Sequence, residues 1–154
     1  MTEKEQLARM IYIASSVHIK QFDRGGKPYI LHPLYIMNKL LYDLQLATIA
    51  VGHDIIEDSN GDVTINSLRA EGFSDRVLDG LDALTHKKED DYLGTYIPNI
   101  CKNYDSIRVK RKDIDHNTRV TRLKGISAKD NLRIEKYHKA YIMLGKAKQV
   151  FLNK

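Results

Sequence analysis

The apolar residues of this chain recur at intervals of three and four positions, and this spacing constrains the fold more than any other feature. Examples are Leu7, Met10, Ile11, Ala14 and Val17 in one segment, and Leu34, Met37, Leu40, Leu41 and Leu44 in a later one. Side chains at that spacing lie on one face of an α-helix. The alternation typical of β-strands is not sustained anywhere. We therefore predict an all-α fold.

The helical segments expected from this pattern cover residues 3–20, 32–43, 45–57, 64–71, 74–85, 90–103, 105–117 and 128–150. Glycine and proline mark the breaks, for example at Gly25, Gly26 and Pro28. Ser127 precedes the last segment, and its hydroxyl can accept hydrogen bonds from the free amides of the first helical turn. The breaks are predicted to be connecting loops, because no linker-like stretch separates two domains.

A length of 154 residues, 42% hydrophobic and 29% charged, suits one globular domain. We expect residues 1–154 to form a single helical bundle.

The charged start of the chain shows no signal region, and no stretch is long enough to span a bilayer, which predicts a cytoplasmic protein without membrane contact. Cys101 is the one cysteine and is expected to be a small core residue. The oligomeric state is left open.

Charge is divided unevenly along the chain, although the net charge is only +5. Residues 1–100 carry 10 basic and 15 acidic side chains, whereas residues 101–154 carry 15 and 5. A basic half beside an acidic half would attract a polyanion such as a nucleotide. The alternative is a solvated basic face with no partner.

The densest group of chemically active side chains lies between Val51 and Asp58 and consists of His53, Asp54, Glu57 and Asp58. His53 and Glu57, like Asp54 and Asp58, are four residues apart and would share a helix face. The alternative is an acidic turn with a packed histidine. That alternative is weakened by Ile55 and Ile56, because titratable groups beside a buried stripe are costly unless they are paired or bind a metal.

Two distant residues are candidates to complete a metal site with this group. His32 precedes Pro33, which favours a helix start, so His32 alone could equally be a core histidine. Asp113 lies four residues before Asn117 in a strongly charged segment, which could equally be a solvated helix. The sequence by itself leaves both alternatives open.

Taken together, these segments resemble the HD-domain phosphohydrolases, and more closely the hydrolase domain of the RelA/SpoT-type alarmone (ppGpp) hydrolases. The resemblance spans about residues 5–145 and rests on ordered motifs: His18-x-x-Gln21, Gly26-x-Pro28-Tyr29-x-x-His32-Pro33, His53-Asp54-x-x-Glu57-Asp58, Leu84-Thr85 and Val109-Lys110-x-x-Asp113-x-x-x-Asn117-x-Arg119.

The resemblance implies roles for particular residues. The positions that bind one manganese ion in that family match His32, His53, Asp54 and Asp113. Glu57 and Asp58 match residues that assist the attacking water. Asn117 and Arg119 match positions near the sugar and phosphates of the substrate. The implied activity is that of a guanosine-3′,5′-bis(diphosphate) 3′-pyrophosphohydrolase, which converts ppGpp to GDP and pyrophosphate.

Two positions depart from the family pattern. The family commonly has an arginine that stacks on guanine where this chain has Asp23, and Arg24 follows here as the candidate substrate-binding cation. Lys112 replaces a usual small residue directly before Asp113. Both departures bear on the identity of the nucleotide, and neither removes a metal ligand.

The donor set independently favours the metal. Two imidazoles and two carboxylates without a thiolate disfavour structural zinc and suit Mn²⁺, Fe²⁺ or Co²⁺, of which we expect manganese.

Three alternative functions stay open: a phosphohydrolase for a different nucleotide, a catalytically silent module that binds nucleotide or nucleic acid, and an HD-type oxygenase. The oxygenase needs further histidines for a second iron, and no evident set is formed by His18, His86, His116 and His138. Nucleic acid is not the expected partner.

Overall fold

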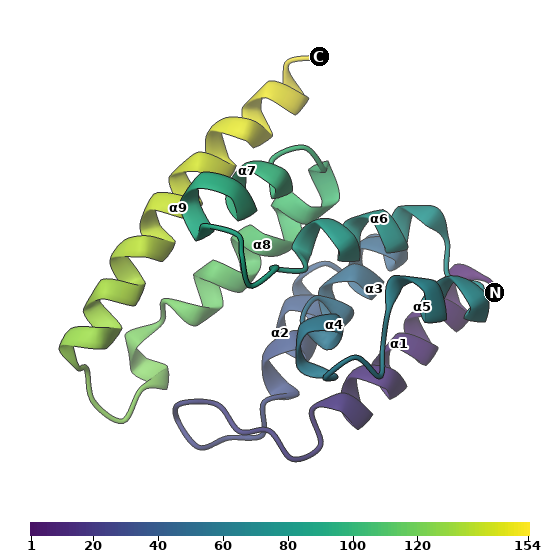
Figure 1. Cartoon of the computed structure of the whole chain (residues 1–154), viewed down its shortest axis with the longest axis horizontal. Coiled ribbons are helices and arrows are strands. Elements are labelled where there is room, and N and C mark those ends of the chain that lie inside the picture. The colour runs from purple at the N-terminus through teal and green to yellow at the C-terminus, as the bar shows by residue number, and fades with distance from the viewer.

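The computed structural model describes all 154 residues and contains helices and loops, with a single isolated bridge between Phe22 and Pro28 (Figure 1). The elements are α1 (Glu3–Val17), α2 (Leu31–Lys39), α3 (Leu44–Gly52), α4 (Ile55–Asp58), α5 (Ile65–Glu71), α6 (Asp75–Leu84), the π-helical η1 (Tyr92–Tyr96), α7 (Ile97–Ile100), α8 (Tyr104–Asn117), the 3-10 turn η2 (Val120–Arg122) and α9 (Ala128–Leu152). The predicted all-α fold is confirmed. None of the helices combines the length and apolar character needed to cross a membrane.

Helix α3 forms the centre of the core. It packs against α1, α2, α6 and α8, and all its residues from Leu46 to Gly52 are buried. A helix that is apolar all round must be surrounded by other helices. On α6, Gly80 lets α3 come close, because a Cβ there would lie 2.6 Å from Cδ1 of Ile49. This tight core fixes the place where the chain leaves α3.

Helix α9 lies on the other side of the molecule. It packs along α8, and its C-terminal end extends beyond the other helices (Figure 1). The helix begins with a capping box in which the Ser127 hydroxyl accepts from the amide of Asp130 and the Asp130 side chain accepts from the amide of Ser127. The predicted start at Ser127 is therefore confirmed. The loop before α2 and the connection between α8 and α9 lie at the same end of the molecule (Figure 1).

The expected continuous helix over residues 45–57 is wrong. Helix α3 ends at Gly52 and α4 begins at Ile55, so His53 and Asp54 lie at a break, and Asp54 has φ −110° and ψ −3°. The Nδ1–H of His53 donates to the carbonyl oxygen of Ala50, which is the acceptor that the Asp54 amide would use in a continued helix. Glu57 and Asp58 consequently lie on α4 and not on a continuation of α3, although the amide of Asp58 still donates to the carbonyl oxygen of Asp54 at 3.0 Å.

Three other expected helices have different bounds. Helix α1 ends at Val17 instead of residue 20, and α2 ends at Lys39 instead of residue 43. The expected helix 90–103 consists of η1 followed by the short α7. Asp91 accepts from the amide of Gly94 at the start of η1, which favours a local turn over a regular helix start.

Candidate metal centre and adjoining cavity

The break between α3 and α4 directs His53 inward, where it is 3% exposed. Its Nδ1–H donates to Ala50 at 2.8 Å, so Nε2 is the nitrogen left to bind a metal, which would replace the proton that the nearby carboxylates favour there. This Nε2 lies 2.9 Å from Oδ2 of Asp54, yet it is buried without a well-aligned hydrogen-bond partner. A buried nitrogen without a partner beside a carboxylate is the arrangement expected of a cation ligand.

His32 is the second residue of α2 and is also buried. Its Nε2 lies 2.9 Å from Oδ1 of Asp113, and its Nδ1 lies 2.7 Å from Nδ1 of His116. Burial and the nearby Arg122 lower the pKa of His116 to about 4, so its ring is neutral at neutral pH and can accept from His32. His116 therefore orients His32 with Nε2 toward Asp113.

Asp113 joins α8 to this cluster. Its Oδ1 also lies 3.7 Å from Nε2 of His53 and accepts from the side-chain amide of Asn117 at 2.7 Å. Its Oδ2 pairs with the buried ammonium of Lys110 at 2.8 Å. Burial disfavours the ionised carboxylate, but Lys110 and the two histidines hold the pKa of Asp113 well below its usual range.

The four residues predicted as metal ligands thus meet at one place. The ligand atoms of His32, His53 and Asp54 lie within 4.8 Å of one another, and Asp113 contacts both histidines. Burial opposes protonation of His53, whereas the carboxylates of Asp54 and Asp113 outweigh it and raise the pKa of His53. A divalent cation would supply the positive charge that these carboxylates attract. The residues present therefore fit a divalent metal with nitrogen and oxygen ligands.

The two predicted catalytic carboxylates lie on α4 and have different partners. Glu57 accepts from the backbone amide of His86 at 2.5 Å. Desolvation raises the pKa of Glu57 although the residue as a whole is exposed, and the His86 amide opposes that rise. Asp58 accepts from the side-chain amide of Gln21 at 3.1 Å, and Nδ1 of His18 donates to the side-chain oxygen Oε1 of Gln21 at 2.7 Å. Asp58 is thereby fixed to the loop after α1.

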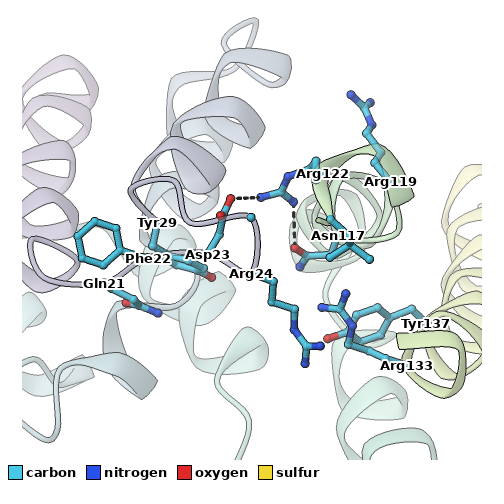
Figure 2. Close-up of a pocket in the computed structure, with 12 residues that line it drawn as sticks. Gln21, Phe22, Asp23, Arg24, Tyr29, Asn117, Arg119, Arg122, Arg133 and Tyr137 are labelled. Carbon is cyan, nitrogen blue, oxygen red and sulfur yellow. Dashed lines mark hydrogen bonds and ion pairs between the residues drawn. The ribbon is translucent and has the colours of Figure 1, made fainter. Parts of the chain in front are cut away.

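A cavity of about 260 Å³ adjoins the cluster (Figure 2). It is lined by residues from the loop after α1, the end of α8, η2 and α9: Gln21, Phe22, Asp23, Arg24, Gly25, Tyr29, Asn117, Arg119, Arg122, Leu123, Arg133 and Tyr137. Tyr29 donates its hydroxyl proton to Asp54, and Asn117 donates to Asp113. These two residues connect the cavity directly to the candidate ligands.

Asp23 is part of this wall but does not contact the candidate ligands. Its Oδ2 pairs with Arg122 at 3.2 Å, and its Oδ1 accepts from the amide of Lys27 at 2.9 Å, which closes the loop (Figure 2). Arg122 also donates to the side-chain oxygen of Asn117. The carboxylate of Asp23 therefore binds the guanidinium of Arg122, which lies 99 residues further along the chain.

The predicted substrate-binding arginines differ in direction. Arg24 crosses the cavity toward α9, pairs with Asp130 at 2.7 Å and is 48% exposed (Figure 2). Arg119 points away from the other labelled side chains and pairs with Asp115 at 3.1 Å (Figure 2). Arg24, Asn117 and Arg119 all line the cavity, but only Asn117 contacts a candidate metal ligand.

Sequence reasoning missed several residues of this site. His116 follows Asp113 by three positions, and this helical spacing could have placed it beside His32. Lys110 precedes Asp113 by three positions and could have been found in the same way. The contributions of Arg133 and Tyr137 depend on how α9 packs, that of Arg122 depends on how η2 lies against Asp23, and no local pattern marks them.

No protein-family model matches the chain. Over 86 residues, 54% of its length, it is 28% identical to a guanosine-3′,5′-bis(diphosphate) 3′-pyrophosphohydrolase of Borreliella burgdorferi. Over 80 residues, 50% of its length, it is 35% identical to a probable GTP pyrophosphokinase of Mycobacterium leprae. The matches cover 12% and 10% of those two proteins. About half of the chain is thus similar to a small part of enzymes named for pyrophosphate chemistry on guanosine nucleotides.

Proposed function

We propose that residues 1–154 form a single HD-type domain that hydrolyses a phosphorylated nucleotide with a divalent metal. The observation that carries this proposal is the contact between the cluster and the cavity. Tyr29 and Asn117 each line the cavity and donate to a candidate ligand, Asp54 or Asp113. A nucleotide in the cavity would thus have its phosphates beside the metal ligands.

His32, His53, Asp54 and Asp113 would hold the metal, which we propose to be Mn²⁺, with Fe²⁺ or Co²⁺ as alternatives. When bound, the ion supplies Lewis acidity toward phosphoryl oxygens and lowers the pKa of water. Lys110 and Asn117 keep Asp113 in place, and His116 orients His32. These supporting contacts reduce the reorganisation that metal binding and catalysis would require.

The proposed substrate is ppGpp and the proposed products are GDP and pyrophosphate. A water oxygen forms a bond to the phosphorus attached to the ribose 3′ oxygen, and the bond from that phosphorus to the 3′ oxygen breaks. Glu57 and Asp58 would take the proton of the water and return a proton to the 3′ oxygen. Their carboxylates have different partners, the amide of His86 and the side chain of Gln21, and burial raises the pKa of Glu57, which suits a group that returns a proton.

The Borreliella burgdorferi relative, named a 3′-pyrophosphohydrolase, supports this substrate and this direction of reaction. The Mycobacterium leprae relative, named a pyrophosphokinase, supports guanosine nucleotide chemistry without favouring hydrolysis. Hydrolysis is favoured because the candidate ligands and two further carboxylates lie together, which suits the activation of water. A second candidate, hydrolysis of a different nucleotide, is favoured by Asp23, whose carboxylate stands in the cavity wall.

The test is a nucleotide panel with metal-depleted protein reconstituted with Mn²⁺. We expect equal amounts of GDP and pyrophosphate from ppGpp, measured by anion-exchange chromatography, and no turnover without added metal. Hydrolysis of another nucleotide in preference to ppGpp would support the second candidate. Stoichiometric metal binding with no hydrolysis of any nucleotide would overturn the proposal and indicate a silent binding module.

A further inference from the structure

A second hollow, of about 220 Å³, lies on the side of α8 that faces away from the candidate metal ligands. We call it the basic hollow, and it is lined by Leu40, Tyr42, Arg108, Arg111, Lys112, Asp115, Tyr141 and Lys148. At about 100° per residue, Arg111 and Asp115 are roughly opposite Asp113 on α8. Lys112, which departs from the family pattern, therefore belongs to this hollow and does not crowd the metal cluster.

Positive charge is in excess in the basic hollow. Its only carboxylate, Asp115, pairs with Arg119 outside the hollow at 3.1 Å. Arg108 shares Asp105 with Arg76, and Lys112 and Lys148 have no ion pair. Four cationic side chains therefore surround a concave space with little compensating negative charge. Such an arrangement lowers the free energy of a bound anion.

The two arginines are held in place by aromatic rings. The guanidinium of Arg111 lies 3.9 Å from the ring centroid of Tyr141 and donates to the Tyr141 carbonyl oxygen at 3.1 Å. The guanidinium of Arg108 lies 5.6 Å from the ring centroid of Tyr42 and donates to its hydroxyl at 3.0 Å. Stacked guanidinium groups keep N–H edges available for oxygen acceptors and lose less entropy on binding.

Gly145 is an independent sign that this arrangement depends on close packing. It lies inside α9, where glycine costs about 1 kcal/mol relative to alanine. A Cβ at this position would lie 2.5 Å from Nη1 of Arg111. The missing side chain therefore makes the room in which the Arg111 guanidinium lies against Tyr141.

We propose that the basic hollow is a second anion site, separate from the metal cluster, that binds the diphosphate group of a small molecule. Its small volume and the convergence of four cations, two of them held by contacts with tyrosines, favour a compact, multiply charged anion over an extended nucleic acid. The diphosphate could come from free pyrophosphate or from a nucleotide. This site does not depend on the proposed hydrolase activity.

The test follows backbone amide resonances of the metal-free, full-length protein during titration with pyrophosphate. We expect saturable shifts in residues 108–115 and 141–148, with a binding curve separate from that of the cavity beside Arg24. Replacing both lysines, Lys112→Ala with Lys148→Ala, should raise the Kd of this curve roughly tenfold or more and leave the other curve unchanged. The matched control, Lys129→Ala with Lys146→Ala, removes two exposed lysines of α9 and should leave both curves unchanged.

Gly145→Ala supplies a variant that should fold well, because alanine favours the helix and only the end of a flexible arginine must move. It should weaken pyrophosphate binding in the basic hollow by roughly threefold or more, because Arg111 leaves its stacked position. A parallel titration with GDP identifies the source: tighter binding than pyrophosphate favours a nucleotide, and weaker binding favours free pyrophosphate. A further titration with single-stranded RNA tests the nucleic acid alternative. The proposal is overturned if neither pyrophosphate nor GDP gives saturable shifts in the hollow, whether or not RNA does, or if the control pair weakens binding as much as the lysine pair.

Discussion

Two neighbouring groups of side chains, the metal wall behind the cavity and the arginine wall that lines it, are held together in different ways. The metal wall consists of His32, His53, Asp54 and Asp113, which are mostly buried and linked by short contacts to one another. The arginine wall consists of Arg24, Arg119, Arg122 and Arg133, which are more exposed as a group. Arg24 and Arg122 pair with carboxylates of distant segments, whereas Arg119 and Arg133 pair with carboxylates four and three residues before them. The comparison indicates that the core positions the proposed chemistry, whereas surface ion pairs position the cations that would meet the substrate.

The largest effect is expected from the metal wall. Asp113→Ala should remove metal and activity together and also destabilise the fold, because Lys110 would keep a buried charge without its partner. Loss of one partner of a buried pair costs about 3–5 kcal/mol. Elemental analysis, turnover and chemical denaturation measure the three effects. A stable variant with full metal content and wild-type turnover would disprove the assignment of Asp113.

His53→Ala separates metal binding from that charge effect, because it leaves the pair of Lys110 and Asp113 intact. It should lose metal and activity with a smaller loss of stability than Asp113→Ala. Equal destabilisation of the two variants would mean that Lys110 does not need Asp113 for the stability of the fold.

An intermediate effect is expected at α4. Glu57→Gln and Asp58→Asn should keep the metal and lower kcat by roughly 10²–10⁴-fold, because they remove proton transfer while preserving side-chain shape. Single-turnover kinetics with ppGpp and elemental analysis measure both properties. Wild-type kcat in both variants would move these residues from catalysis to structure.

The smallest effects are expected in the arginine wall. Arg122→Ala should raise KM for ppGpp roughly tenfold with metal content unchanged, because Arg122 contacts both Asp23 and Asn117 at the cavity. Arg119→Ala should change KM by less than about twofold, because Arg119 points away and its exposed pair with Asp115 contributes little. Steady-state kinetics of the two variants test this order. A larger effect for Arg119 would mean that its side chain turns inward when substrate binds.

Asp23 and Arg122 show why specificity was hard to predict from the sequence. The resemblance implied that a carboxylate at position 23 would disturb the nucleotide site. In the folded chain this carboxylate pairs with Arg122 and accepts from the amide of Lys27. The partner lies 99 residues away, and no local pattern identifies it.

The helices and their ends were largely determined by local sequence. Helical spacing and the capping residue Ser127 act within a few positions, so they can be interpreted without knowing the fold. The motif around His53 and Asp54 nominated residues that the fold brings together with His32 and Asp113, and their role as metal ligands stays a prediction. The break after Gly52 was not evident from the sequence, because the bond between His53 and Ala50 that accompanies it holds a ring whose other nitrogen faces Asp113 of a distant helix. The tertiary structure alone decided the partners of His32, Asp23 and Arg111, since contacts between distant segments form only when helices pack and bury their shared faces.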